Sequence, residues 1–218
     1  MDNVLDDIEI RIIGCLIEKE MTTPEYYPMT LNALTNACNQ KSNRDPVVSY
    51  EETAVAQALD SLQRKGFARK TLLAGSRVPK YLHTVLDRFD LSKQEIAILC
   101  ELMLRGPQTP GEIRSRAERM SAFDNLEEVE KSLQGLMEHD PPLAVKLSRE
   151  TGRKECRYVH LLSGSTSEEI IAHDLPSEPS VTRVPTDERI MRLEEEIARL
   201  RSELEELRQA FGEFKAQF

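Results

Sequence analysis

Residues 62–82 carry six basic side chains and no acidic one. Lysine and arginine neutralise phosphates and release the counterions around a nucleic acid, so an acid-free basic stretch predicts contact with a phosphate backbone. A solvated, charged protein surface is the alternative interpretation of the same pattern. The six candidates are Arg64, Lys65, Arg69, Lys70, Arg77 and Lys80.

Further basic candidates lie where acidic side chains are more frequent. Lys41 and Arg44 belong to a polar loop that we expect to reach a phosphate. Near residue 150 the basic side chains are diluted by Glu150 and Glu155. The remaining candidates for contact with DNA are Arg114, Arg116, Arg119, Arg149, Arg153, Lys154 and Arg157.

Histidine recurs in a pattern that raises the question of catalysis: Tyr81 and His83 return as Tyr158 and His160. Alternate residues of a strand share one face, but a catalytic histidine also needs a positioned partner, and the sequence identifies none. We therefore interpret both pairs as packing. The chain has no Gly-rich phosphate loop, GxSxG or HExxH motif, so we predict no enzyme activity, no catalytic residues and no cofactor.

The four cysteines form no CxxC motif and no Cys/His cluster. A zinc site or a disulfide framework is therefore not expected, and we predict no metal ligands. Three of the cysteines stand among apolar residues of helical or strand segments, which is typical of buried thiols. The four residues are Cys15, Cys38, Cys100 and Cys156.

The segments that position these residues occur twice. Residues 8–16 return in outline as residues 94–102, at an offset of 86. Two further sets recur: Val55, Leu59 and Leu62 return as Val129, Leu133 and Leu136, and Tyr81-Leu82-His83 returns as Tyr158-Val159-His160. Such repetition predicts two copies of one small domain, which we call copy 1 (residues 1–87) and copy 2 (residues 88–164).

Apolar periodicity and capping signals predict the same element order in each copy. Capping boxes are expected for Asp6 with Glu9, Ser49 with Glu52, Ser92 with Glu95 and Thr109 with Glu112, and Gly66 is expected to end the third helix of copy 1. That order is helix, helix, helix, strand, loop, strand, which is typical of a helix-turn-helix followed by a two-stranded wing. The fold class is therefore mainly α (α+β), with two winged-helix domains in tandem. The expected helices cover about 6–20, 30–39, 49–65, 92–104, 109–120 and 125–138, and the expected strands 67–73, 80–86, 144–149 and 156–162.

The remainder of the chain predicts a linker, residues 165–185, and a coiled-coil helix, residues 186–218. The linker is rich in Ser and Pro. In the helix, apolar side chains alternate spacings of three and four, and the flanking charges complement one another in a parallel dimer. Packing of this helix against its own domains is the alternative. The candidate dimerisation residues are Ile190, Leu193, Ile197, Leu200, Leu204, Leu207, Phe211 and Phe214.

Several long runs occur in one order: EKE at 18–20, TTPEYYP at 22–28, NACNQKSNRDP at 36–46, LRGPQTPGE at 104–112 and GRKECRYVHLL at 152–162. In these runs the chain resembles the YceH-like family of uncharacterised bacterial proteins, over residues 8–164. The resemblance implies two winged-helix domains in tandem. It implies no established activity.

The third helix of each copy argues against deep insertion into DNA. Base edges are usually bound by Arg, Lys, Asn or Gln, whereas the outward positions of this helix are rich in carboxylates in both copies, from Glu51 onward and from Glu127 onward. We therefore expect backbone contact through the wings. The first hypothesis is a dimeric DNA-binding protein, in the role of a transcriptional regulator; the alternative is a tandem winged-helix scaffold that mediates protein–protein interaction.

Net charge and hydropathy limit the kinds of partner that we expect. Of the net charge of −9, residues 165–218 contribute −6, from 7 basic and 13 acidic side chains, so the two copies are close to neutral. No apolar run approaches the roughly 18 residues of a membrane span. We expect a cytoplasmic protein with no membrane partner, a homodimer through its last helix, and double-stranded DNA or a protein as partner.

Overall fold

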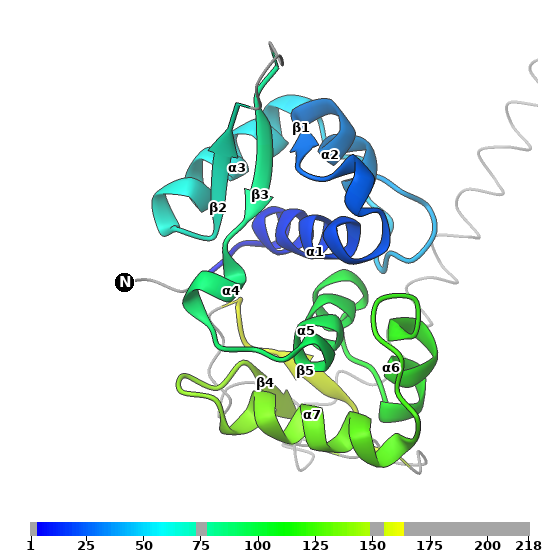
Figure 1. Ribbon diagram of the computed structural model, residues 1–218. Helices are drawn as coiled ribbons and strands as arrows, with labels where there is room; N and C mark the ends of the chain where they lie inside the picture. The colour runs from blue at the N-terminus through cyan, green and yellow to red at the C-terminus, as the bar shows by residue number, and fades with distance from the viewer. Residues whose placement is uncertain (1–3, 73–77, 149–154, 164–218) are drawn as a thin grey trace, which may run out of the picture. The chain divides into compact units, whose positions relative to one another are not determined.

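The computed structural model describes residues 4–72, 78–148 and 155–163 (Figure 1). All of these residues belong to one compact unit. Several predictions fall outside the described residues: the linker 165–185, the helix 186–218 and all eight dimerisation residues from Ile190 to Phe214. Among the DNA candidates the same holds for Arg77, Arg149, Arg153 and Lys154.

Both copies show the predicted order of three main helices followed by two strands, in a mixed α and β structure with small antiparallel sheets. Copy 1 consists of α1 (Asp7–Thr22), η1 (Pro24–Tyr26), β1 (Met29–Thr30), α2 (Leu31–Cys38), α3 (Glu52–Lys65), β2 (Ala68–Thr71), β3 (Lys80–His83) and α4 (Val85–Arg88). Copy 2 consists of α5 (Lys93–Arg105), α6 (Pro110–Ala117), α7 (Leu126–Glu138), β4 (Ala144–Lys146) and β5 (Tyr158–His160).

The two sheets differ in size. In copy 1 the strand order is β1-β3-β2, with β2 antiparallel to β3 in a register that pairs Arg69 with Leu82 and Lys70 with Tyr81. Strand β2 is therefore an edge strand. Copy 2 has the two-stranded sheet β4-β5, with Val145 opposite Val159. The short elements η1, β1 and α4 were not predicted.

Among the described helices, three begin with a reciprocal capping box. Reciprocal capping boxes join Asp6 with Glu9, Ser92 with Glu95 and Thr109 with Glu112, as predicted. The end of α3 at Gly66 is also confirmed, because Gly66 has φ +75°, a left-handed conformation that glycine adopts without strain.

The capping box predicted from Ser49 to Glu52 is wrong. Helix α3 begins at Glu52 with no side-chain cap. The amide of Asn39 bonds both backbone groups of Tyr50, accepting from its N–H at 2.7 Å and donating to its carbonyl at 2.8 Å. This contact anchors the chain one residue after Ser49, and Glu51 takes the cap position instead.

Helices α1 and α5 lie side by side at the centre of the compact unit, so one hydrophobic core runs through both copies (Figure 1). Gly14 permits their close approach, because a Cβ at this position would lie 2.8 Å from Cδ2 of Leu104. The predicted buried thiols are confirmed at Cys15, Cys38 and Cys100. Among the described residues, no helix combines the length and apolar character needed to cross a bilayer.

Candidate nucleic-acid interface

Copy 1 leaves a group of cations on its surface. Arg69 and Lys70 are exposed on the edge strand β2, Arg64 is exposed near the end of α3, and Lys80 is half-buried at the start of β3. Neighbouring residues of a strand point to opposite faces, and both of these side chains reach solvent. In the described part of the chain none of the four has an ion-pair partner. Arg64 donates only to the carbonyl of Asp60, at 3.3 Å.

Lys65, the remaining described candidate of this basic stretch, is directed inward. Its Nζ lies 2.6 Å from Oε2 of Glu9 and donates to the carbonyl of Val4 at 2.8 Å. Burial alone would raise the pKa of Glu9, but the hydrogen bond from Lys65 leads a set of contacts that hold it below its usual value. Lys65 therefore stabilises copy 1 and is not free to contact a phosphate.

Arg44 was predicted to reach a phosphate, and this prediction is wrong. Its side chain is fully buried. The guanidinium forms an ion pair with Glu18 through two nitrogens, at 2.5 and 3.0 Å, and also donates to the carbonyl of Ala37. Lys41, in the same loop, is exposed. The loop thus offers one cation to solvent and uses the other to hold itself to α1.

Arg119 joins the two copies. One of its nitrogens bonds Oε1 of Glu18 on α1, and another bonds Oε1 of Glu101 on α5, at 2.9 Å. We call Glu18, Arg44, Glu101 and Arg119 the seam cluster. Burial alone would raise the pKa of Glu18, but the two arginines outweigh it and lower this pKa to about 2.

The long loop of copy 1 also contacts copy 2 directly. The Asp45 N–H donates to the carbonyl of Leu104 at 3.0 Å, and Arg105 donates to the side-chain oxygen of Asn43. Sequence reasoning missed this role. The available signal was an acidic residue, Glu18 or Glu101, inside an otherwise apolar stretch of helix.

The other described DNA-binding candidates of copy 2 are engaged by the protein itself. Arg116 donates to Oε1 of Gln108 at 2.8 Å and pairs with Glu112. Arg157 donates to the carbonyl of Pro107 at 2.6 Å and also faces Glu112, at 3.4 Å. Arg114, although exposed, donates to the carbonyl of Asp124 at 2.8 Å.

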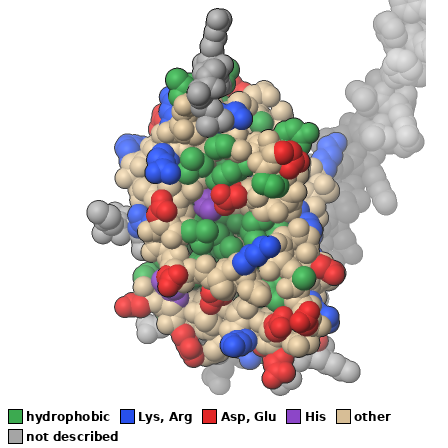
Figure 2. All heavy atoms as spheres, viewed as in Figure 1, with side chains coloured by type: hydrophobic (Ala, Val, Ile, Leu, Met, Phe, Trp, Pro, Cys, Tyr) green, Lys and Arg blue, Asp and Glu red, His purple; other side chains and the backbone are tan. Residues whose placement is uncertain are grey.

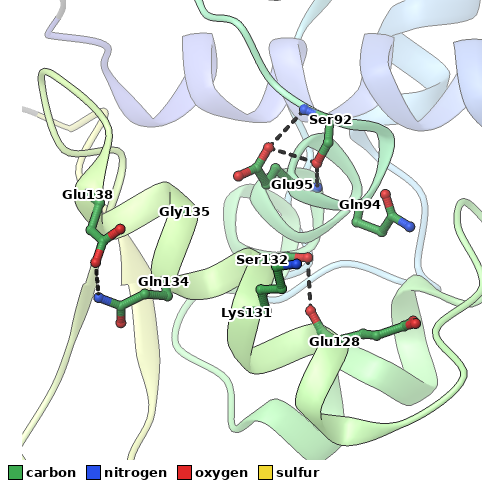
Figure 3. Close-up of a pocket in the computed structure, with 9 residues that line it drawn as sticks. All are labelled: Ser92, Gln94, Glu95, Glu128, Lys131, Ser132, Gln134, Gly135 and Glu138. Atoms are coloured by element: carbon green, nitrogen blue, oxygen red, sulfur yellow. Dashed lines mark hydrogen bonds between the residues drawn. The ribbon is translucent and has the colours of Figure 1, made fainter.

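The third helices carry exposed carboxylates, as expected. Glu51, Glu52 and Asp60 are exposed at α3, and α7 exposes Glu127, Glu130 and Glu138. Figure 2 shows acidic side chains gathered over the lower part of the face, where Figure 1 places α7. Beside α7, an open groove of about 630 Å³ runs along the start of α5 (Figure 3).

The two repeated histidines are buried but differ in their partners. His83 Nε2 lies 2.6 Å from Oε2 of Glu20, a partner that the sequence did not reveal, and Nδ1 accepts from the Val85 N–H at 3.3 Å. Both ring nitrogens are thus occupied, which favours the packing interpretation. His160 Nδ1 is buried with no hydrogen-bond partner in the described residues, and burial lowers the pKa of His160 to about 4.

Comparison with known proteins gives a family. A family model described as "Protein of unknown function, DUF480" matches residues 5–153. The chain is 53% identical over 221 residues to a UPF0502 protein of Geotalea uraniireducens and 54% identical over 219 residues to one of Geobacter metallireducens, with 100% of each chain covered. A UPF0502 protein of Koribacter versatilis is 59% identical over 162 residues, covering 74% of this chain and 75% of the relative. The chain therefore belongs to the DUF480, or UPF0502, family of bacterial proteins of unknown function.

Proposed function

We propose that this protein binds double-stranded DNA through copy 1, in the role of a transcriptional regulator. We further propose that each copy is a winged-helix domain, as the resemblance to the YceH-like proteins implies. The observation that carries the proposal is a set of cations at the edge strand β2 and its surroundings that have no ion-pair partner among the described residues: Arg64, Arg69, Lys70 and Lys80. In a winged helix, β2 and β3 are the arms of the wing.

The chemistry supports backbone contact more than base readout. Cations without an ion-pair partner are available to displace counterions from phosphates. The exposed carboxylates of Glu51, Glu52 and Asp60 on α3 would repel phosphates if this helix entered a groove. We therefore propose that affinity comes from the wing and from the last turn of α3, and that it depends only weakly on base sequence.

The dimer belongs to the same proposal. The apolar heptads of residues 186–218 favour a parallel coiled coil of two helices. A dimer of DNA-binding domains contacts two sites on one duplex, which would raise the affinity of a weakly basic domain. We propose a cytoplasmic homodimer of this kind.

The test is a fluorescence anisotropy titration of a labelled random-sequence duplex at about 50 mM salt, where phosphate contacts are strong. The double substitution Arg69→Glu with Lys70→Glu is expected to abolish binding. The matched control is Lys93→Glu with Lys146→Glu, which makes the same change in net charge at exposed lysines of copy 2. Binding by the first variant at the level of the control would contradict the proposal.

A further inference from the structure

The capping glutamate of α1 is neutralised within copy 1. Oε2 of Glu9 accepts from the Asp6 N–H at 2.8 Å and from Nζ of Lys65 at 2.6 Å, and the Glu9 side chain has no exposed surface. Lys65 comes from the last turn of α3. Copy 1 thus supplies an ammonium group of its own to this carboxylate.

Copy 2 has the same glutamate without that cation. The repeat aligns Glu9 with Glu95, and the offset of 74 between the third helices aligns Lys65 with His139. The ring of His139 is directed elsewhere, against the edge of Phe89, with centroids 5.5 Å apart. Within the described ranges, no basic side chain pairs with Glu95.

The space beside Glu95 is open because α7 has a glycine there. The same offset aligns Ser61 with Gly135, and a Cβ on Gly135 would lie 2.1 Å from Oε1 of Glu95. The other oxygen, Oε2, accepts from the backbone N–H and the hydroxyl of Ser92, at 2.8 and 2.7 Å. A glycine inside a helix is less favourable than alanine, and here it leaves room for the carboxylate at the wall of the groove.

The groove of about 630 Å³ carries an excess of negative charge (Figure 3). Three carboxylates line it, those of Glu95, Glu128 and Glu138, against one ammonium group, that of Lys131. The chain's own residues 165–218 do not complement this charge, because they hold 7 basic and 13 acidic side chains. DNA phosphates would be repelled in the same way.

We propose that the α5–α7 groove binds a lysine- or arginine-bearing segment of a partner protein, whose cation takes the place beside Glu95 that Lys65 fills beside Glu9 in copy 1. This inference is independent of DNA binding by copy 1. It assigns the two copies different partners: a phosphate backbone for the basic wing of copy 1 and a basic peptide for the acidic groove of copy 2.

The test uses the full-length protein and a fluorescein-labelled peptide in which glycines alternate with lysines and arginines. A second peptide carries norleucine in place of every cation. Glu95→Gln preserves the shape of the groove and removes its central charge. Glu127→Gln is the matched control, because Glu127 is exposed on α7, the other helix of the groove, but does not line the groove. His139→Lys gives copy 2 a lysine at the position that Lys65 holds in copy 1, and this lysine should compete with the peptide for Glu95.

The cationic peptide is expected to bind the natural protein and the Glu127→Gln variant within twofold of each other. Binding to Glu95→Gln and to His139→Lys is expected to be at least tenfold weaker, while their unfolding temperatures show that both variants are folded. Equal binding by the Glu95 and Glu127 variants would overturn the proposal, since general charge attraction would then suffice. Equal binding of the norleucine peptide, or no binding of the cationic peptide at millimolar concentration, would also overturn it.

Discussion

Copy 1 and copy 2 carry similar numbers of basic side chains, but the two copies place them differently. On the edge strand β2 of copy 1, Arg69 and Lys70 are exposed and have no ion-pair partner among the described residues. Copy 2 exposes one lysine on its equivalent strand, Lys146, whereas Arg116 and Arg157 bond Gln108, Glu112 and the carbonyl of Pro107. Net charge is therefore a poor guide to which domain can contact a phosphate.

The physical reason is the cost of exchanging partners. An arginine that already donates charge-assisted hydrogen bonds must break them before it binds a phosphate, so little is gained. A free lysine or arginine on an edge strand gives up only water and counterions. The comparison thus locates the candidate DNA surface in copy 1 and leaves the groove beside α7 available to a different kind of partner.

The largest effect is expected where the two copies meet. Arg44→Met removes one of the two cations that neutralise the buried Glu18, and loss of one partner from a buried ion pair typically costs about 3–5 kcal/mol. We expect the free energy of unfolding, measured with urea, to fall by about 3 kcal/mol, since Arg119 remains. Lys41→Met, an exposed site in the same loop, is the control and should change it by less than about 0.5 kcal/mol.

One of the repeated histidines, His160, should make the stability of the protein depend on pH. His160 has a folded-state pKa of about 4, below the ordinary value of 6.5, so the stability it contributes is full above pH 6.5 and is lost as the pH falls toward 4. The loss attributable to this residue is about 3 kcal/mol. His160→Leu should remove that part of the pH dependence of the free energy of unfolding. Identical pH profiles for the two proteins would contradict this assignment.

The starts of the third helices give a smaller contrast. In copy 2 the side chain of Asn125 accepts from the Glu128 N–H at 2.9 Å, whereas α3 of copy 1 has no side-chain cap. Asn125→Ala should therefore destabilise the protein by about 1 kcal/mol. Ser49→Ala should leave the midpoint of urea unfolding unchanged. A loss at Ser49 as large as that at Asn125 would show that the capping box predicted from the sequence forms in solution.

The smallest expected effect compares single arginines. Arg64→Ala removes one exposed cation near β2 and should weaken binding of a random duplex about threefold, because one phosphate contact is lost. Arg116→Ala removes a cation that the protein already binds and should leave the affinity unchanged. Anisotropy at one fixed salt concentration measures both. A larger loss from Arg116→Ala would place the DNA surface on copy 2.

Local signals predicted the parts of the fold that depend on neighbouring residues. Helix periodicity, the capping boxes at Asp6, Ser92 and Thr109, and the stop at Gly66 all act within one or two turns. The prediction at Ser49 failed because a distant side chain, Asn39, fixes Tyr50. The elements η1, β1 and α4 were missed for the same reason, since two to four residues carry no periodic pattern and form only against the rest of the fold.

The candidate site was predicted in part. Arg69 and Lys70 could be identified because they belong to a basic stretch with no acidic residue nearby in the sequence, and two adjacent charged side chains of a short strand are rarely buried. The buried position of the Arg44 side chain could not be predicted, because it depends on an ion pair with Glu18, which lies 26 residues away along the chain. The groove beside Glu95 could not be predicted for a similar reason. Only the folded structure shows that the His139 ring packs against Phe89 and does not pair with Glu95 as Lys65 pairs with Glu9.

The most direct test of the account is the dependence of DNA affinity on salt. We would measure the binding constant of a random duplex across salt concentrations for three proteins: the natural chain, Arg69→Ala with Lys70→Ala, and the copy 2 control Lys93→Ala with Lys146→Ala. Because each phosphate contact contributes about 1 to the slope of log affinity against log salt, the first variant should lose about 2 units of slope and the control none. Equal slopes for both variants would contradict the claim that the wing of copy 1 contacts the DNA backbone.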